Sequence, residues 1–535
     1  MKQKLLYALL IVTTAMASCS KSFTERPALD APSLDNFYTT AAQVKGATGT
    51  LYGSPWFNFN DKAFACIGEV LSGNSWTGDP AYSPYLNFSV SSTDPRLSEA
   101  WSSFYQIMGS ANVLINTFET KKAQGGDPAI LDPGIAEARF IRGVVVFYLA
   151  RIWGDAPIIT DPAKIAASGD FSIPRYLQAD LFRFAQEDFE YAEANLPETN
   201  DKGRVTKYSA IGMQAKMYLY RGDYDKAKQK ADQVIQSNRY SLFNDYQGMF
   251  SASVNNNNVE SLFALQWVNT PQWGTQNSLQ AYTAPSNLLV TSDGWSSTIP
   301  SLDLKNAYDP GDNRRKWSLM EQGSFYPAWK PQRPVNNAAD ADYNDFMKNG
   351  YIYDTGSTAR TQANPLLNVR NSSRANFSKY VVGPGSATEP VEKQKTQICT
   401  YLLRYADILL IYAEAVLGAN ASTSDAGALA AFNKVHERAG LPPVSSLTKD
   451  MILHERRVEF AFEGDYWFDI QRQGLAKAQA IVAAQERGQI DYTRPGGVNS
   501  LKVTLTLPYK DLYLPIPLSE TVQNPKLNEP AVPYY

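Results

Sequence analysis

The feature that most constrains the fold is a helix, a tight turn and a second helix between Val205 and Ser237. Helical periodicity continues on both sides of Arg221-Gly222-Asp223-Tyr224. Small residues fall where two antiparallel helices would approach closely: Ala215, Gly222, Ala227 and Ala231. A pair of this kind buries its apolar face only against neighbouring helices, so it predicts further pairs rather than an isolated hairpin.

A second helical pair is predicted from Tyr405 to Leu417 and from Ala426 to Ala439. Together with Tyr218 and Tyr224, the small residues of the first pair resemble a tetratricopeptide-type repeat. We therefore predict a mainly α fold with a tetratricopeptide-like helical-pair scaffold. The scaffold is expected at about residues 40–60, 96–238 and 401–473, within a single domain of residues 34–535.

Two segments without helical periodicity interrupt this scaffold. Residues 61–95 combine glycine and proline with Trp76 and Tyr82, and residues 239–398 hold five of the ten tryptophans in a large, irregular, loop-rich insertion. Within the insertion, residues 262–267 (Leu-Phe-Ala-Leu-Gln-Trp) are compatible with a strand. Long irregular stretches are uncommon in compact domains unless they carry function, so we predict that both segments face a ligand.

The N-terminus resembles a bacterial lipoprotein signal. A basic start precedes an apolar run from Leu5 to Ala17, which is too short to span a bilayer comfortably. The run ends in Met16-Ala17-Ser18-Cys19, which is similar to a lipobox, in which the cysteine becomes the first residue and is acylated. We expect a signal peptide at residues 1–18, a tether at 19–33 and attachment to the membrane through Cys19.

The densest group of arginine and glutamate lies between residues 452 and 472. At helical spacing Arg456, Glu459 and Glu463 fall on one stripe, where Arg456 and Glu459 can pair while the two glutamates repel each other. This stripe is flanked by apolar residues, so it needs cations from elsewhere in the fold. The candidates are Arg404 and Arg472. We interpret the group as a structural ionic network that joins helices, since such networks perturb pKa values without performing chemistry.

Four short motifs occur between residues 137 and 517. They are Glu137-Ala138-Arg139-Phe140, Leu403-Arg404-Tyr405-Ala406-Asp407, Glu455-Arg456-Arg457-Val458-Glu459-Phe460 with its continuation to Arg472, and Tyr513-Leu514-Pro515-Ile516-Pro517. Together they resemble the SusD/RagB family of nutrient-binding lipoproteins of Bacteroidetes, with a departure at Asp465-Tyr466, where the family often has His-Arg. The resemblance implies an outer-membrane lipoprotein that faces the cell exterior, binds oligosaccharides and delivers them to a SusC-like TonB-dependent transporter.

The residue types argue against several other functions. Only two histidines occur, so a histidine-rich metal site is impossible, and His454-Glu455 lacks the second histidine of a zinc peptidase because Val458 takes its place. Residues 340–344 begin like a calcium loop, but Asp345 lies where glycine is required. A net charge of −3 gives no reason to expect a nucleic-acid partner. We expect no metal site, no cofactor and no enzymatic activity.

Aromatic side chains in the two irregular segments suit a sugar, because a sugar ring has an apolar face and a rim of hydroxyl groups. The family resemblance implies an aromatic platform built from both segments. The candidate ligand-binding residues are Asn74, Trp76, Tyr82, Trp273, Tyr282 and Trp295. The ionic stripe lies far in sequence from both segments, so we expect a Glu459 substitution to lower stability and leave sugar affinity nearly unchanged.

Two alternatives from other classes remain open. A lipid-anchored glycoside hydrolase needs only two placed carboxylates, and the chain has 53 aspartate and glutamate residues. A peptide-binding or tetratricopeptide scaffold lipoprotein would use the helical pairs instead. The sequence also leaves open the identity of the sugar and whether Cys66 and Cys399 form a disulfide.

Overall fold

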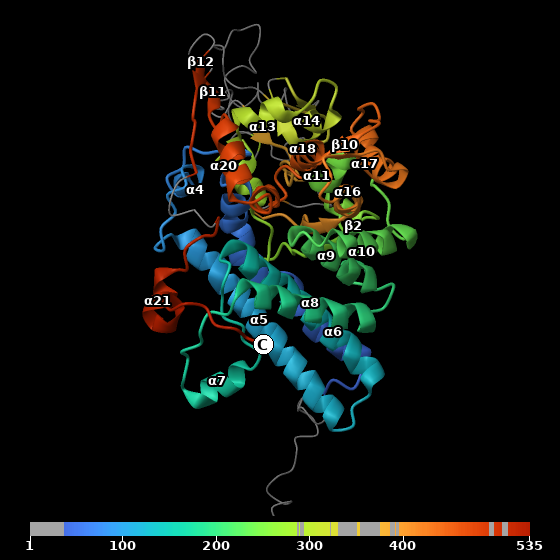
Figure 1. The fold of residues 1–535 in the computed structure, drawn as a ribbon, viewed down its shortest axis with the longest axis vertical. Helices are drawn as coiled ribbons and strands as arrows, with labels where there is room; N and C mark the ends of the chain where they lie inside the picture. Colours follow the sequence, from blue (N-terminus) through green and yellow to red (C-terminus); the bar gives the residue numbers. More distant parts are fainter. Residues whose placement is uncertain are drawn as a thin grey trace, which may run out of the picture.

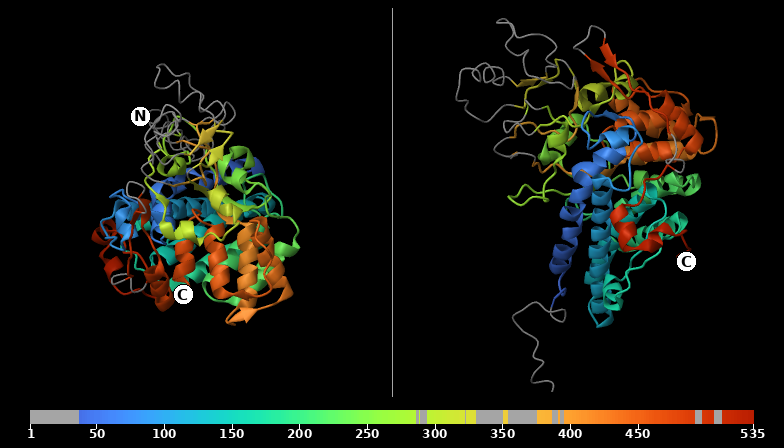
Figure 2. Two further views of the ribbon diagram at one scale, coloured as in Figure 1. Left: turned by 90° about the horizontal axis from the view of Figure 1, so that it is seen from above. Right: turned by 90° about the vertical axis from the view of Figure 1, so that its left-hand side faces the viewer.

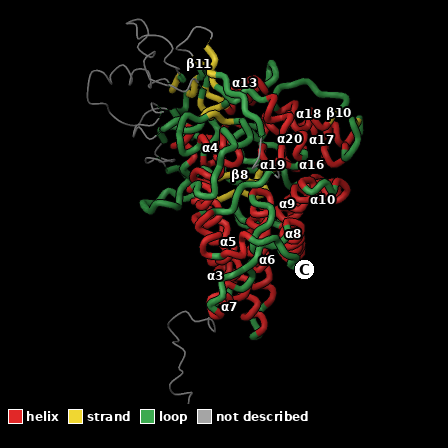
Figure 3. The backbone as a smooth tube through the Cα atoms, turned by 60° about the vertical axis from the view of Figure 1, so that its left-hand side comes forward, coloured by secondary structure: helices red, strands yellow, loops and turns green. Residues whose placement is uncertain are grey.

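The computed structural model describes residues 37–285, 288, 294–321, 323–329, 350–353, 375–385, 391, 395–491, 497–505 and 512–535. Helices form most of this part of the chain, and the short strands lie in the upper half of Figure 3. The first helices are α3 (Ala41–Gly49), α4 (Ser83–Leu86), α5 (Pro95–Ala123), α6 (Pro128–Ile152), α7 (Pro162–Ser168), α8 (Gln178–Asn195), α9 (Lys207–Tyr220), α10 (Tyr224–Gln236) and α11 (Tyr246–Ser251).

The later helices and the strands follow in the same numbering (Figure 1). The helices are α12 (Leu279–Thr283), α13 (Leu302–Ala307), α14 (Asn313–Ser318), α16 (Tyr405–Leu417), α17 (Ala426–Arg438), α18 (Lys449–Glu459), α19 (Tyr466–Gln471), α20 (Leu475–Ala484) and α21 (Leu518–Gln523). The strands are β1 (Ser75–Trp76), β2 (Ser261–Leu265), β3 (Ile299–Pro300), β4 (Leu319–Met320), β5 (Phe325–Tyr326), β6 (Tyr351–Ile352), β7 (Asn376–Phe377), β8 (Thr400–Arg404), β9 (Ser422–Thr423), β10 (Leu447–Thr448), β11 (Gln489–Asp491) and β12 (Gly497–Asn499).

The lower half of the molecule is built on three long helices, with α5 packed on α6 and α6 packed on α8 (Figure 2). Asp94 and Asp127 cap α5 and α6, and each accepts hydrogen bonds from backbone N–H groups of the first turn. A proline follows each cap at the first helical position, where its missing N–H would have no partner in any case. These caps fix where the two longest helices begin.

Both predicted helical pairs are confirmed. Helices α9 and α10 meet at Gly222, whose φ of 74° is a left-handed conformation that favours glycine, and α16 packs against α17. Helix α10 also packs on α16, so the pair before the insertion lies beside the pair that follows it (Figure 1). The prediction of a mainly helical, tetratricopeptide-like scaffold is therefore confirmed.

The insertion is fastened to the scaffold where it leaves and where it returns. The strand expected at residues 262–267 is present as β2, and it pairs antiparallel with β8. In this pair Ser261 lies opposite Arg404 and Leu265 lies opposite Thr400. Strand β8 continues directly into α16, so the two ends of the insertion meet at the first residue of the second helical pair.

The first irregular segment begins later than the sequence suggests. π-Helical turns occupy Phe59–Ala63 and Cys66–Val70, so the chain is helical well beyond residue 61 and becomes irregular only near Leu71. Wider π turns shift the apolar residues away from the α-helical period, which explains why the pattern did not predict a helix here. Such turns occur frequently at functional sites.

The two cysteines of the body are both buried and both free thiols, so Cys66 and Cys399 do not form a disulfide. Among the described residues no helix is long and apolar enough to cross a membrane. The same part of the chain contains no cluster of three or more histidine, cysteine, aspartate or glutamate side chains that could hold a metal ion. Cys19, the expected signal peptide and tether, and the calcium-loop-like residues 340–344 lie outside the described residues.

Candidate ligand-binding site

Two tryptophans, Trp273 and Trp295, are exposed at the surface of the insertion. The Trp273 ring packs edge-on against Phe57, with 5.5 Å between ring centroids, and Trp295 packs edge-on against Tyr282 at 5.2 Å. The Tyr282 hydroxyl donates to Asp61 Oδ1 at 3.1 Å. Trp273 thus contacts the segment of residues 57–61 directly, whereas Trp295 is connected to it only through Tyr282. Trp273 and Trp295 are 52% and 43% exposed, which leaves both rings accessible to a ligand.

Trp76 lies on a loop that strand pairing joins to the second irregular segment. In the β1–β3 pair Trp76 lies opposite Ile299, and Thr77 Oγ1 donates to the Ser297 carbonyl oxygen at 2.7 Å. Strand β3 follows Trp295 closely in the chain, so the pairing brings the loop of Trp76 beside the loop of Trp295. Trp76 itself is half-buried.

The remaining three predicted residues lie behind the tryptophans. Tyr82 and Tyr282 are buried, with 6.4 Å between their rings, so they back the Trp295 ring rather than face solvent. Burial, and then the Asp61 carboxylate, raise the pKa of Tyr282 well above its usual value, which keeps its hydroxyl a neutral donor. Asn74 is fully buried and offers no group to the surface. We call Trp76, Trp273 and Trp295, with Tyr82 and Tyr282 behind them, the aromatic platform.

Charged side chains that sequence reasoning missed border the aromatic platform. Lys62 Nζ lies 5.4 Å from the centre of the Tyr282 ring, and Arg96 Nε lies 3.3 Å from Glu99 Oε2. Burial raises the pKa of Asp61, against the hydrogen bond that it accepts from the Ser278 hydroxyl. These charges come from a helical turn and from the start of α5, and only the fold brings them beside an aromatic ring. The basic side chains supply hydrogen-bond donors, and the acidic side chains supply hydrogen-bond acceptors.

The loop that carries Trp76 is held from behind by Arg487, which is fully buried. The Arg487 guanidinium donates to the carbonyl oxygens of Leu71 at 3.0 Å and Leu86 at 3.3 Å. Burial lowers the pKa of Arg487 to about 9. Ser301 Oγ donates to a third backbone oxygen of the loop, that of Gly73, at 2.6 Å. These bonds fix the backbone position of the loop.

The charged stretch of residues 455–464 lies directly against this loop. Arg457 Nε donates to Asn74 Oδ1 at 2.9 Å, and the Gly464 N–H donates to Glu69 Oε1 at 2.7 Å. The Asn74 amide also donates to Glu69, so the three side chains form one buried chain of hydrogen bonds. Burial raises the pKa of Glu69 to about 7. Two regions that are distant in sequence are therefore neighbours in space.

Arg404 lies at the centre of a buried ionic network. Its guanidinium contacts Glu459 at 2.7 Å, Glu463 at 2.7 Å and Glu260 at 2.6 Å. Burial opposes ionisation of Glu459, but the guanidinium groups of Arg438 and Arg404 outweigh it and hold the pKa of Glu459 well below its usual range. The network joins β8, α17 and α18 through charges that have almost no exposure to water.

Arg456 does not pair with Glu459, contrary to the expectation from their spacing. Its guanidinium instead contacts Asp407 at 2.7 Å and Asp469 at 2.8 Å. Arg472 also contacts Asp469, at 2.9 Å, rather than the glutamates of α18. Both arginines face the carboxylates of α16 and α19, whose positions depend on tertiary packing and therefore could not be predicted from spacing within one helix.

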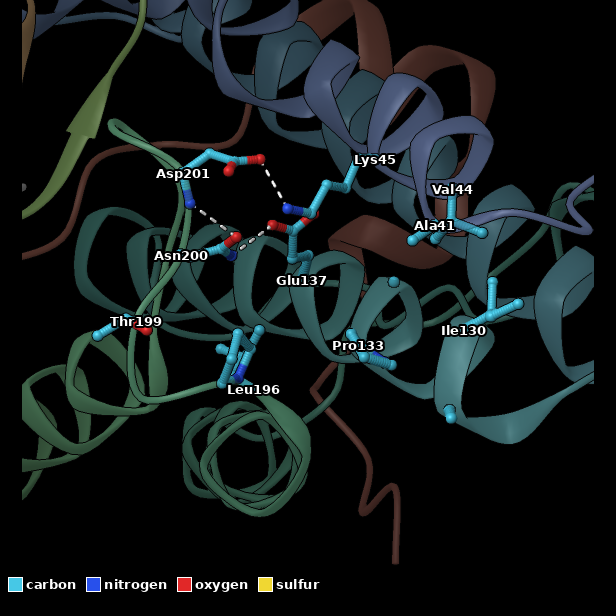
Figure 4. A pocket seen from close by; sticks show the side chains of 13 residues that line it. Ala41, Val44, Lys45, Ile130, Pro133, Glu137, Leu196, Thr199, Asn200 and Asp201 are labelled. Carbon is cyan, nitrogen blue, oxygen red and sulfur yellow. Dashed lines mark hydrogen bonds and ion pairs between the residues drawn. The ribbon is translucent and has the colours of Figure 1, made fainter.

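Figure 4 shows a cavity of about 460 Å³ between α3, α6 and the connection from α8 to α9. Its walls are mostly aliphatic, and no aromatic ring lines it. Its polar groups bind one another, since Lys45 pairs with Asp201 at 2.6 Å and Asn200 donates to Glu137 at 3.3 Å. The cavity therefore lacks the flat ring and the unpaired polar groups that a sugar needs.

The chain matches two family models that together span most of its length. Residues 232–535 match the SusD family, and residues 32–219 match a family described as starch-binding and associating with the outer membrane. A SusD-like protein of Bacteroides ovatus is 33% identical over an alignment that covers 100% of this chain and 98% of the relative.

Solved structures have the same fold. A crystal structure with xylogluco-oligosaccharide superimposes with a TM-score of 0.79 at 32% identity and covers 92% of this chain and 99% of the other. A laminarin-binding SusD-like protein superimposes with a TM-score of 0.68 at 21% identity, covering 91% of this chain and 98% of the other, a likeness of fold alone.

Proposed function

The chain belongs to the SusD family, and from this premise we propose that it is a non-catalytic protein whose aromatic platform binds an oligosaccharide. The observation that supports the proposal is the exposure of Trp273 and Trp295, which are connected to the segment of residues 57–61 through Phe57 and Tyr282, with Trp76 on the strand that pairs with β3. Exposed indole rings on a fixed backbone offer flat apolar surfaces, and the charged groups beside them offer hydrogen-bond partners for hydroxyl groups.

The relative bound to xylogluco-oligosaccharide supports a neutral glycan as the ligand of this chain, because the two proteins share 32% identity and nearly their whole length. The balanced charges beside the platform, Lys62 and Arg96 against Asp61 and Glu99, also suit an uncharged chain of sugars. A xylogluco-oligosaccharide is therefore the first probe.

We further propose that the protein is lipid-anchored through Cys19 in the outer membrane, faces the cell exterior and delivers its ligand to a SusC-like TonB-dependent transporter for nutrient uptake. The family model matched by residues 32–219, described as associating with the outer membrane, supports the location. The lipobox-like residues before Cys19 support the anchor. Labelling with radioactive palmitate, and its loss in Cys19→Ala, tests the anchor; co-purification of a barrel transporter tests the partner.

Binding is tested by titrating the full chain with a xylogluco-oligosaccharide in a calorimeter and by screening a glycan array. Trp76→Ala, Trp273→Ala and Trp295→Ala should each raise Kd by about tenfold, which corresponds to about 1.4 kcal/mol. Phe171→Ala is the matched control, because Phe171 is an exposed ring that lies outside the platform. Unchanged affinity in all three tryptophan variants would overturn the site.

The two alternatives predict different results in the same experiments. A glycoside hydrolase would release reducing sugar from the glycans that it binds, whereas the proposed function predicts binding without turnover. A protein-binding scaffold would give no heat with any glycan on the array. The arrangement at Asp61 favours binding, because its carboxylate accepts hydrogen bonds from Ser278 and Tyr282 and thereby positions a ring.

A further inference from the structure

Polar groups that lack a hydrogen-bond partner gather on one side of the aromatic platform. The Tyr82 hydroxyl, Arg96 Nε and Glu99 Oε2 are buried atoms that make no hydrogen bond among the described residues. Arg96 Nε and Glu99 Oε2 lie 3.3 Å apart as an ion pair, but their alignment is not that of a hydrogen bond. Buried polar atoms are rarely left without a hydrogen bond, so these three point to a partner that the described chain does not supply.

The fold brings the Arg96–Glu99 ion pair to Tyr282 of the platform. Helix α5, which carries the pair, packs on the π-helical turn Phe59–Ala63, and α12, which carries Tyr282, packs on the same turn. Burial and then the Asp61 carboxylate raise the pKa of Tyr282, and smaller, opposed effects of Arg96 and Glu99 act on the same hydroxyl. Such effects weaken with distance, so both charges lie near the ring that supports an exposed indole.

Lys62 adds a second cation, from that π-helical turn. Its side chain is half-buried, and among the described residues its ammonium group makes no ion pair and no hydrogen bond. The Nζ atom lies 5.4 Å from the centre of the Tyr282 ring, which packs edge-on against Trp295. An ammonium group has three donors, and those of Lys62 are left unused beside an exposed indole.

The ion pair is only partly covered, which leaves it open to a ligand. The Glu99 side chain is 34% exposed and the Arg96 side chain 14%. Burial raises the pKa of Glu99, against the effect of the Arg96 guanidinium, so the carboxylate gains from a further hydrogen-bond donor. A hydroxyl group suits the set because it both donates and accepts, whereas Lys62 and Arg96 only donate and the Glu99 carboxylate only accepts. A neutral sugar carries several hydroxyl groups around its ring.

From these unpartnered groups beside an exposed indole, we propose that Lys62, Arg96 and Glu99 determine which glycan the platform accepts, by binding a hydroxyl group of the sugar unit that stacks on Trp295. The proposal rests on the proposed function, because it requires a sugar on the platform. Indole rings stack on the apolar face of many sugars, so they supply affinity without distinguishing one glycan from another. A polar site built for a hydroxyl group rejects a sugar that lacks it there, because the polar side chains then lose their partner.

The test measures, by calorimetry, Kd of the full chain for xylogluco-, cello- and manno-oligosaccharides of equal backbone length. The ratio of the weakest to the tightest Kd reports discrimination. Lys62→Met and Glu99→Gln should each raise the Kd of the tightest glycan about fivefold and reduce this ratio. Trp295→Ala should weaken all three glycans and preserve the ratio. Glu119→Gln is the matched control, because Glu119 forms an ion pair of the same i,i+3 spacing on α5, with Lys122 at 3.1 Å.

Two results would contradict the proposal and leave the proposed function standing: a ratio that Lys62→Met and Glu99→Gln both leave at the wild-type value, or equal Kd values of the wild type for all three glycans. A drop in affinity caused by unfolding is recognised by thermal denaturation, and Lys62→Met should leave Tm unchanged because its ammonium group makes no hydrogen bond among the described residues. Failure of the proposed function gives a different pattern. In that case the wild type would bind no glycan of the array, and this proposal would be rejected with it.

Discussion

Arg457 Nε donates a hydrogen bond to Asn74 Oδ1 at 2.9 Å, although the two residues are 383 positions apart in the chain. The bond connects α18, part of the charged stretch, to the loop that presents Trp76. Asn74 carries the connection further, because its amide donates to Glu69 at 3.1 Å and Glu69 accepts from the Gly464 N–H. A helix that contains no residue of the platform therefore helps to set the position of the platform.

Asn74→Ala should lower both stability and ligand affinity. The change removes one buried hydrogen-bond partner from the Arg457 guanidinium and one from Glu69, although Arg457 keeps Asp303 and Glu69 keeps the Gly464 N–H, and we expect a cost of about 2 kcal/mol. The loop should also lose its fixed position, so Kd for a xylogluco-oligosaccharide should rise severalfold although Asn74 is fully buried. Calorimetry and urea denaturation measure the two effects; lowered stability with unchanged Kd would exclude the positioning role.

Glu459→Gln should lower stability and leave affinity within twofold of the wild type. Removing one charge from a buried network typically costs about 3 kcal/mol, because the partners, here Arg404 and Arg438, remain buried without full compensation. Thermal denaturation should show a lower Tm. Glu529→Gln, on an exposed side chain, is the control. A loss of affinity as large as that of Asn74→Ala would show that the network also shapes the platform.

Stability should fall as pH rises through neutrality, because of Glu69. Burial raises its folded-state pKa to about 7 from 4.5, so its contribution is fully present below pH 4.5 and is lost as pH rises through 7. A shift of this size corresponds to about 3 kcal/mol. Urea denaturation at pH 5, 6, 7 and 8 should show this fall in the wild type. In Glu69→Leu the fall should be absent; an equal fall in both proteins would assign it to another group.

Tyr282→Phe should weaken binding at the platform without destabilising the body greatly. The ring that supports Trp295 remains, but the hydroxyl that holds it to Asp61 at 3.1 Å is lost. We expect a loss of about 1 kcal/mol in stability and a rise of a few fold in Kd. The Trp295 fluorescence should change as its support loosens. Tyr218→Phe, on α9 of the helical scaffold, serves as the control, since it should alter none of the three readouts.

Cys66 and Cys399 should react with a thiol reagent only after unfolding. Both are buried, and burial raises the pKa of each thiol, to about 11 for Cys399, so neither is exposed as a thiolate at neutral pH. Titration with Ellman's reagent should detect no fast-reacting thiol from these two residues in the native protein. Tm should be the same with and without reducing agent; a drop in Tm on reduction would contradict the free-thiol state.

The helical scaffold was predictable because its signals are local. The small residues near Gly222 and the apolar periodicity of residues 405–417 specify helices that pack closely, and the structure has both pairs. The π-helical turns at Phe59–Ala63 and Cys66–Val70 were missed, since a one-residue widening of the turn removes the α-helical period on which such predictions depend. Helix propensities of the residues do not distinguish a π-helical turn from an α-helical one.

The sequence indicates which segments hold the candidate site, but not which of their residues are exposed or what each residue contacts. The sequence predicts candidate aromatic residues in the two irregular segments, but it does not separate Trp295, which is exposed, from Tyr82, which is buried. Asn74 resembled a ligand-binding amide in a polar loop, and only its long-range bond to Arg457 places it in the interior. Burial of a loop residue depends on what packs against the loop.

The pairing of β2 with β8 has a consequence for how such proteins diversify. Because both ends of the insertion meet at one point, the insertion can be exchanged between relatives as a cassette while the helical pairs stay unchanged. The buried ion pairs between the insertion and the scaffold limit such an exchange. Arg314 and Lys379 of the insertion contact Glu459 and Glu463 of the scaffold in addition to Arg404, so an incoming segment without these cations would leave both glutamates with less buried compensation. Changes in ligand preference are therefore constrained by the ion pairs that join the insertion to Glu459 and Glu463.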